Sequence, residues 1–352
     1  MAEESPEGSL VAVTGGTGFI GTHLVHRLTS DGQRVRVLVP HVDHHLPSPL
    51  LHAAVEAVPG DITDPDALDR LVTGARTVYH LAGYARAWAP KRREYTRVNV
   101  DGTIAVCRAC RAHDVPLLLH VSTNLAEHGD DPRRILTEYQ RTKLRAEELI
   151  RARVEQGCAA VVVRPTRVFG PGLLTESNAV TRLIQLYRRG LLRLRLADRG
   201  ARGNYVYVED LVDGMVRAAG RGTVGAAYTL GGENASFEEF LATLAAVTGR
   251  GGRVFTLPLS VALGAARVAE LAARVRLRPP ITRDWVSLYV IDWPSSSEDA
   301  RRDLGYAPRS LREGIEETVR WLESGDDPWA FTGTERKMQG ARDGADAARQ
   351  PE

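Results

Sequence analysis

The chain has 352 residues, 43% of them hydrophobic and 26% charged, with a formal net charge of +2. This composition is ordinary for a globular protein, and basic residues spread along the whole chain give no nucleic-acid footprint. No apolar run reaches the length of a membrane span, and the acidic start lacks the apolar core of a signal peptide. We therefore expect a cytoplasmic protein that binds neither nucleic acid nor a membrane.

The three cysteines form no recognisable framework. Cys107 and Cys110 are three residues apart in a helical pattern with no second pair, and Cys158 is alone. This spacing supports neither a set of disulfides nor a zinc site. We interpret all three as small apolar residues and expect no bound metal.

The first predicted strand, residues 10–13, leads into three glycines at a three-residue spacing, Gly15, Gly18 and Gly21. Behind the turn, apolar residues recur with helical period at Phe19, Ile20, Leu24, Val25 and Leu28. Glycines in such a turn allow a sharp bend and the close approach of a pyrophosphate, and a helix N-terminus offers free N–H groups to phosphates. With a second strand at 34–39, the pattern predicts a dinucleotide site; the alternative is a glycine-rich turn that merely precedes a helix.

Short apolar runs then alternate with helical patterns through the first half of the chain. Beyond the first two strands, we predict strands at 53–58, 77–81, 117–121 and 159–163, and helices at 65–73, 91–113 and 137–156. Strands that alternate with helices imply right-handed crossovers and a parallel sheet covered on both faces. The fold class is therefore α/β, with a Rossmann-type doubly wound sheet.

Helical patterns dominate after residue 172. They fall at 177–190, 210–220, 236–248, 259–277, 283–290 and 311–324, with strands at 204–208 and 228–230 between them. We expect a dinucleotide-binding domain over 10–172, to whose sheet later strands return, and a smaller, mostly helical substrate lobe over 173–324. Residues 1–9 and 325–352 have little apolar content and are expected to be disordered tails.

Tyr139 and Lys143 are the strongest candidates for acid–base chemistry. Four residues apart, they share one face of the helix predicted at 137–156. A phenol whose pKa is about 10 is a poor acid–base catalyst at neutral pH, and a neighbouring cation lowers that pKa. Only three lysines occur among the 46 basic residues, so a lysine at this spacing is informative. The alternative is an exposed pair on a surface helix.

A series of short motifs recurs along the chain: Thr14–Gly21, Gly60–Asp64, His80–Gly83, Asn99–Thr103, His120–Thr123, Tyr139-x-x-x-Lys143, Arg164–Gly172 and Tyr205–Asp210. In combination they resemble the extended short-chain dehydrogenases/reductases, which include NAD-dependent epimerases and dehydratases. The similarity runs from residue 10 to residue 321 and is nearest to the dihydroflavonol-reductase and 3β-hydroxysteroid-dehydrogenase side of that family. It implies an NAD(P)-dependent oxidoreductase.

The resemblance also implies the roles of the catalytic residues. Tyr139 would be the general acid, and Lys143 would bind the ribose hydroxyls and lower the pKa of Tyr139. Thr123 would hydrogen-bond the substrate carbonyl, with Ser122 as the alternative register. Asn99 would help to organise the lysine and a water molecule.

A larger set of residues would bind the cofactor if the resemblance holds. The three glycines would hold the pyrophosphate, Asp61–Ile62 would flank the adenine, Ala82–Gly83 would line the cleft, and Pro165–Thr166 would lie beside the nicotinamide carboxamide. The full set is Thr14, Gly15, Thr17, Gly18, Phe19, Ile20, Gly21, His41, Asp61, Ile62, Leu81, Ala82, Gly83, Lys143, Pro165 and Thr166.

The end of the second strand departs from the family pattern. Val39 is followed by Pro40 and His41, with no Asp or Glu to accept the adenosine ribose hydroxyls. This absence, with His44 and His45 nearby, favours NADP(H) slightly over NAD(H), although an Arg for the extra phosphate is missing as well. The histidines could also suggest a metal site, but they lie in a polar loop without carboxylates at suitable spacing.

Three features concern the substrate side. Thr123 and Tyr139 are only sixteen residues apart, which implies a more open pocket than in relatives. Where sugar-nucleotide members of the family carry an Arg and an Asn for the diphosphate, this chain has Gly203, beside Arg202, and Arg167. The apolar stretch 255–266 and the helix continuing to residue 271 resemble the steroid-dehydrogenase side and are candidates for the pocket wall; the alternative is that they are core.

We therefore expect a ketoreductase or alcohol dehydrogenase that reduces a carbonyl on a fairly large, apolar small molecule, polyketide-, flavonoid- or steroid-like, as in secondary metabolism. A sugar-nucleotide epimerase or dehydratase is the alternative, and it would need a diphosphate site. A non-catalytic NADP-binding regulator is a third hypothesis, against which the intact Tyr139 and Lys143 argue. Either a monomer or a homodimer is compatible with the sequence.

Overall fold

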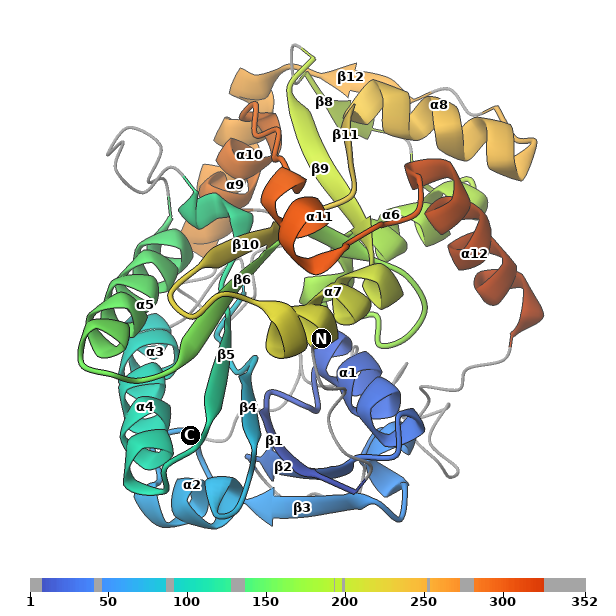
Figure 1. Ribbon diagram of the computed structural model, residues 1–352. Helices are drawn as coiled ribbons and strands as arrows, with labels where there is room; N and C mark the ends of the chain where they lie inside the picture. The colour runs from blue at the N-terminus through green and yellow to red at the C-terminus, as the bar shows by residue number, and fades with distance from the viewer. Residues whose placement is uncertain are drawn as a thin grey trace, which may run out of the picture.

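The computed structural model describes residues 8–40, 46–86, 92–127, 137–192, 194–197, 200–251, 254–272 and 282–325 (Figure 1). Its centre is a seven-stranded sheet in the order β10-β6-β5-β4-β1-β2-β3, and every neighbouring pair is parallel. The strands are β1 (Leu10–Thr14), β2 (Arg34–Val39), β3 (Val55–Pro59), β4 (Thr77–His80), β5 (Leu117–Val121), β6 (Ala160–Pro165) and β10 (Ala227–Leu230). The predicted α/β class and doubly wound parallel sheet are confirmed.

Helices cover both faces of this sheet (Figure 1). Apolar side chains from alternate strand positions pack on one face against α1 (Phe19–Ser30) and α7 (Val208–Arg221). The opposite face packs against α2 (Pro65–Val72), α4 (Gly102–Ala112) and α5 (Glu138–Glu155). The inner strands β1, β5 and β6 are buried on both faces and are nearly continuous apolar runs, which the sequence located to within two residues.

The long helix predicted at 91–113 is interrupted. It consists of α3 (Arg93–Thr96), a π-helical turn (Arg97–Asp101) and α4, while residue 91 lies outside the described ranges. A π turn accommodates an extra residue within a helix and often marks a functional site. Here it displaces Asn99 from the regular α-helical spacing and places it, nearly inaccessible, against α5.

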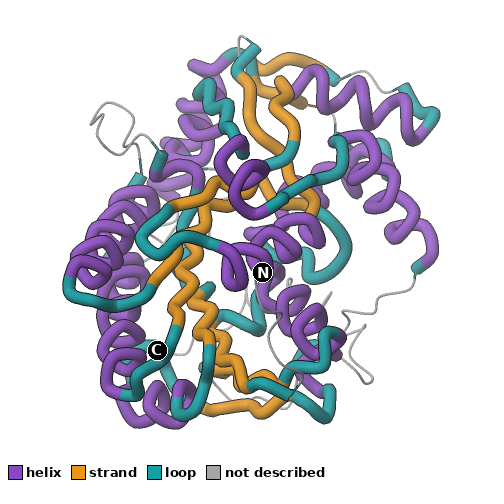
Figure 2. The backbone as a smooth tube through the Cα atoms, viewed as in Figure 1, coloured by secondary structure: helices purple, strands orange, loops and turns teal. Residues whose placement is uncertain are grey.

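The second half of the chain builds a smaller layer above the carboxyl ends of the strands (Figure 1). Figure 2 shows the strands in orange and the helices in purple in the same view. A three-stranded sheet has the order β11-β9-β7, and β8 pairs with β12. The strands of this layer are β7 (Arg167–Phe169), β8 (Leu194–Leu196), β9 (Arg202–Tyr207), β11 (Glu233–Ser236) and β12 (Phe255–Leu257). The helices of this layer are α6 (Ala179–Arg188), α8 (Phe237–Thr248), α9 (Leu259–Ala272), α10 (Arg283–Val290) and α12 (Leu311–Ser324). The short α11 (Glu298–Leu304) packs instead on the main sheet, against α7 and β10.

Short elements account for the differences from the sequence prediction. Strands β7, β8, β11 and β12 were not expected, and neither was α11, because three to seven residues are too few to show a periodic pattern. The predicted tails beyond residues 8–325, and the end of the helix predicted to reach residue 277, lie outside the described residues. None of the helices within the described ranges combines the length and the apolar character needed to cross a bilayer.

The glycine-rich turn between β1 and α1 is packed backbone against backbone. Gly15 has φ of +75°, and a Cβ there would lie 2.6 Å from the amide nitrogen of Ala82. A Cβ on Gly21, inside α1, would lie 2.1 Å from the carbonyl oxygen of Gly15, whereas one on Gly18 would lie 3.3 Å from the same oxygen. Gly21 therefore tolerates no side chain unless the turn moves substantially, whereas a Cβ at Gly18 requires a shift of only a few tenths of an ångström.

This contrast predicts the stability of two matched variants. Gly21→Ala should lower the free energy of unfolding by about 1–3 kcal/mol, because the added methyl overpacks the turn. Gly18→Ala should lower the free energy of unfolding by far less, because its Cβ lies further from the carbonyl oxygen of Gly15. Equilibrium denaturation followed by circular dichroism measures both, and equal stabilities would show that the turn relaxes freely.

Candidate active site

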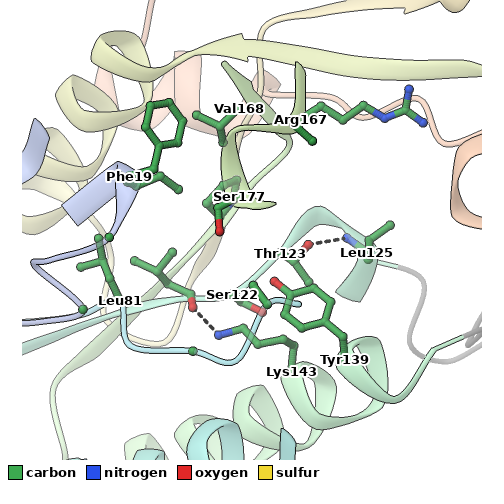
Figure 3. A pocket seen from close by; sticks show the side chains of 18 of the residues that line it. Phe19, Leu81, Ser122, Thr123, Leu125, Tyr139, Lys143, Arg167, Val168 and Ser177 are labelled. Atoms are coloured by element: carbon green, nitrogen blue, oxygen red, sulfur yellow. Dashed lines mark hydrogen bonds between the residues drawn. The ribbon is translucent and has the colours of Figure 1, made fainter. Parts of the chain in front are cut away.

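One large cavity of about 690 Å³ opens at the carboxyl ends of the parallel strands. Its walls come from the glycine turn and strand ends on one side and from the smaller layer on the other (Figure 3). Ligands of open parallel sheets bind at this edge, where connections leave in opposite directions. The cavity is therefore the candidate active site.

Most of the residues expected for the cofactor and for catalysis line this cavity. They are Gly15, Thr17, Gly18, Phe19, Ile20, Gly21, Asp61, Ile62, Leu81, Ala82, Gly83, Thr123, Tyr139, Lys143, Pro165 and Thr166. Thr14 and Asn99 are not among the lining residues, and His41 lies outside the described residues. Thr14 instead bonds to the ring of His80 at 2.7 Å and to the Ala82 amide at 3.2 Å, and so joins β1 to the end of β4.

The glycine turn presents the N-terminus of α1 to the cavity. Gly18 is the N-cap of this twelve-residue helix, its backbone is extended, and no side chain occupies the free N–H groups behind it. Gly15, Gly18 and Gly21 all line the same end of the cavity. A helix N-terminus with open backbone is suited to a pyrophosphate, so this turn fits a dinucleotide.

The opposite rim of this end holds an ion pair that the sequence did not reveal. Arg97, in the π turn, donates to Asp61 Oδ1 at 2.7 Å, and both residues line the cavity. Burial alone raises the pKa of Asp61, but hydrogen bonds from Thr63 and Arg97 outweigh it and hold the pKa below its usual range. Asp61 is therefore an ionised acceptor at the place expected for the adenine.

Lys143 is nearly inaccessible, and its ammonium lies at the base of the cavity. Nζ donates to the carbonyl oxygen of Val121, at the end of β5, at 2.6 Å (Figure 3). Burial lowers the pKa of Lys143 to about 8, and the charge of Glu147 acts in the opposite direction. Glu147, one turn further along α5, is itself paired with Arg164 of β6 at 3.0 and 2.5 Å. At neutral pH the lysine therefore remains mostly a cation.

Tyr139 faces the same space, one turn before Lys143. Its side chain is half-buried because it borders the cavity. The protein atoms around the phenol desolvate it and raise its pKa to about 12, although a hydrogen bond with Thr123 acts to lower the pKa. The expectation that Lys143 lowers this pKa is not met in this structure, because burial dominates. A phenol with a raised pKa stays protonated at neutral pH, which is the form that donates a proton.

Two hydroxyls at the site have no partner among the described residues. Ser122 Oγ and Thr166 Oγ1 are both buried, and both residues line the cavity. Buried hydroxyls are nearly always hydrogen-bonded, so these two are available to a bound molecule. Thr166 fits the expected place of the carboxamide. Thr123 contacts Tyr139, while Ser122 has the unused hydroxyl, so both remain candidates for the substrate carbonyl.

Asn99 lies behind the site as a positioning residue. Its Oδ1 accepts from the Tyr84 amide at 2.7 Å, and its Nδ2 donates to Thr142 Oγ1 at 2.9 Å. It thereby connects the segment after β4 to α5 immediately before Lys143. The side-chain bonds of Asn99 go to Tyr84 and Thr142, so its water-mediated role toward Lys143, expected from the resemblance, stays a prediction.

The other end of the cavity is mostly apolar and aromatic. It is formed by residues of β7, β9, α6, α8 and α10 and by a following loop, which the sequence did not single out: Val168, Val180, Leu183, Tyr205, Phe237, Phe240, Leu288, Tyr289 and Trp293. Val168 and Tyr205 belong to the family motifs noted in the sequence, but no motif shows that these nine residues form one wall, because they come together only through tertiary packing. This end can enclose a sizeable apolar group.

The stretch 255–271, for which pocket wall and core were the two alternatives, does not line the cavity. Ala262 and Ala266 of α9 are buried in a separate small cluster with residues of β8 and α10. Phe255 and Leu271 are 64% and 50% exposed. The structure therefore contradicts the pocket-wall alternative, and the core alternative holds for Ala262 and Ala266 but not for the exposed Phe255 and Leu271. Apolar residues in an amphipathic helix do not reveal which neighbour they face.

Comparison with known proteins agrees with this arrangement. The model of the NAD dependent epimerase/dehydratase family matches residues 11–231, from β1 to the end of β10. The 2-alkyl-3-oxoalkanoate reductase of Stenotrophomonas maltophilia (strain K279a) is 30% identical over 332 residues, covering 87% of this chain and 97% of the relative.

Two further proteins extend the comparison. The 4-hydroxy-2-methyl-3-oxo-4-farnesyl-3,4-dihydroquinoline-1-oxide ketoreductase of Stigmatella aurantiaca is 30% identical over 313 residues, covering 84% of this chain and 91% of the relative. The structure of UDP-glucuronic acid 4-epimerase from Bacillus cereus in complex with NAD has a TM-score of 0.71 at 22% identity, covering 91% of this chain and all of that one. At this identity the likeness is one of fold.

The glycine end of the cavity generates a binding prediction. Gly18→Val places a branched side chain in front of the α1 N-terminus, and the extended backbone of Gly18 can accept it. Detectable binding of NADPH and NADH, measured by fluorescence titration, should be lost, while the thermal unfolding temperature stays close to that of the unaltered protein. Unchanged affinity would mean that the phosphates bind elsewhere.

Proposed function

The chain belongs to the NAD dependent epimerase/dehydratase family and is an NAD(P)-dependent oxidoreductase; on this premise we propose that it interconverts a ketone and a secondary alcohol on a fairly large, apolar small molecule. One observation carries the proposal. A protonated phenol, Tyr139, stands between a dinucleotide cradle and an apolar chamber in one continuous cavity.

In the direction of reduction, Tyr139 donates its proton to the carbonyl oxygen, and Thr123 or Ser122 hydrogen-bonds the same oxygen as negative charge develops on it. When bound, NAD(P)H supplies the hydride that the carbonyl carbon receives. Lys143 supports the step as a buried cation on the same helical face, where it would bind the ribose hydroxyls and so position the cofactor against the carbonyl. In oxidation the same groups work in reverse.

Three observations support a reductase over the sugar-nucleotide alternative. The chamber beyond Tyr139 is walled by rings and aliphatic side chains. The position where the resemblance places a diphosphate-binding Arg is occupied by Gly203. The names of two relatives at 30% identity describe reductases of carbonyl compounds with alkyl or farnesyl chains, which fits an apolar chamber.

For the cofactor, a preference for NADP(H) is part of the proposal. Pro40, directly after β2, is exposed and lines the cavity. A carboxylate here would repel a 2′-phosphate and accept the ribose hydroxyls of NAD, and this position carries none. The expected contribution of His41 stays a prediction.

Replacing the proton donor tests the mechanism. Tyr139→Phe should lower kcat at least about a hundredfold, because it removes general acid catalysis, and leave cofactor affinity nearly unaltered. Lys143→Ala should impair both kcat and cofactor affinity. The assay follows oxidation of NADPH with the best ketone from a panel of aromatic, steroid and long-chain 3-oxo ester compounds. A near-normal rate for Tyr139→Phe would show that the proton comes from the substrate or from water.

Introducing a carboxylate tests the cofactor preference. The unaltered protein should bind NADPH at least as tightly as NADH. Pro40→Asp should weaken NADPH binding about tenfold relative to NADH, through repulsion of the 2′-phosphate. Pro40→Asn is the matched control, because Asn has the shape of Asp without its charge. A tenfold preference of the unaltered protein for NADH would contradict the assignment.

A further inference from the structure

Arg167 introduces a cation into the apolar chamber. It is the first residue of β7, which begins two positions after Pro165 at the end of β6. The side chain lines the cavity and extends away from Tyr139 (Figure 3). It therefore lies toward the part of the chamber that the reacting end of a substrate does not occupy.

Aromatic groups hold the guanidinium in place. Nη1 donates to the hydroxyl of Tyr205 at 3.0 Å, and Cζ lies 5.4 Å from the ring centre of Tyr205 and 5.8 Å from that of Tyr289. Tyr205 is itself buried and stacked on Phe240 with ring centres 5.0 Å apart. These contacts orient the side chain, because a guanidinium between two rings is fixed in plane and position.

The backbone beside Arg167 is shaped to admit the guanidinium. Gly203, on the neighbouring strand β9, lies directly against it, and a Cβ at this glycine would come within 2.3 Å of Cζ. Any other residue at 203 would displace the arginine head. The absence of a side chain at Gly203 thus leaves the space that the guanidinium of Arg167 occupies.

The charge of Arg167 is not balanced within the described part of the chain. No carboxylate there forms an ion pair with it, and the phenol of Tyr205 is its one hydrogen-bond acceptor. The adjacent amide of Asn204 is already occupied by Gly232, Asn234 and Ser295. A guanidinium has five N–H donors in a flat fork that matches a carboxylate, and a partly desolvated cation gains most from such a partner.

We propose that Arg167 binds a carboxylate of the substrate, separated by an apolar spacer from the carbonyl that Tyr139 protonates. The enzyme then prefers long-chain oxo acids to neutral ketones. The inference rests on the proposed function for the reacting carbonyl, whereas the anion subsite itself is independent of turnover. Specificity follows from both ends of the chamber, since the spacer must bridge the distance between the phenol and the guanidinium.

The experiment uses methyl-ketone fatty acids in which carbonyl and carboxylate are separated by methylene chains of increasing length, each with its methyl ester. At the best spacing, kcat/KM should favour the acid over its ester by at least about tenfold. In Arg167→Met this ratio should fall close to one, and in Arg167→Lys it should keep an intermediate value. Because the ratio is taken within each variant, a general loss of rate cancels.

A matched control and a binding measurement complete the test. Arg202→Met removes an exposed arginine next to Gly203 that does not line the cavity, and it should keep the preference for the acid. A saturated fatty acid has no ketone and therefore reports binding alone. Calorimetry should show that the NADP+-loaded protein binds this acid more tightly than its methyl ester, and the difference in affinity should be lost in Arg167→Met.

The outcomes separate the two proposals. If fatty acid and ester bind alike to the unaltered protein, or if Arg167→Met keeps the difference, the carboxylate subsite is wrong. If the acid binds more tightly but no ketone is reduced, the subsite stands and the reductase assignment fails. Inhibition by UDP that Arg167→Met relieves would identify a diphosphate as the anion and would also overturn the carboxylate assignment.

Discussion

The burial of one ammonium group at the end of the sheet is the constraint on which the site depends. Because Lys143 is enclosed and bonded to the carbonyl of Val121, α5 can dock only in the rotation that turns this face toward β5. That rotation also brings Tyr139 to the cavity and carries Glu147 to Arg164 on β6. A four-residue interval on one helix therefore positions the proton donor, the cation and the counter-charge together.

The two ends of the cavity make different demands on the chain. The glycine end uses backbone groups, and it is assembled from the first strands and turns in nearly continuous order. The chamber beyond Tyr139 uses side chains from five separate elements, including strands of only three to six residues. The cofactor end therefore depends on few side chains. The shape and charge of the substrate end, in contrast, can change with single residues such as Arg167.

The sequence was most informative where structure is local. The glycine turn and the Tyr139–Lys143 spacing could be recognised because each lies within one turn or one helix. Arg97 and Arg167 could not, since their meaning depends on partners 36 and 38 positions away. The stretch around Phe255 was left open between pocket wall and core, because its hydrophobicity does not specify a neighbour. The raised pKa of Tyr139 was also beyond reach, because desolvation depends on every element around the phenol.

The late arrival of β10 has a consequence for synthesis of the chain on the ribosome. Residues 227–230 form the edge of the main sheet beside β6, although about sixty residues, which include α7 and part of the smaller layer, are made between β6 and β10. Until they emerge, the backbone groups of Val162–Pro165 on that side of β6 have no strand to pair with. An open strand edge invites pairing with other chains. The nascent protein is thus most exposed to aggregation after its nucleotide-binding strands are complete and before this last one closes the sheet.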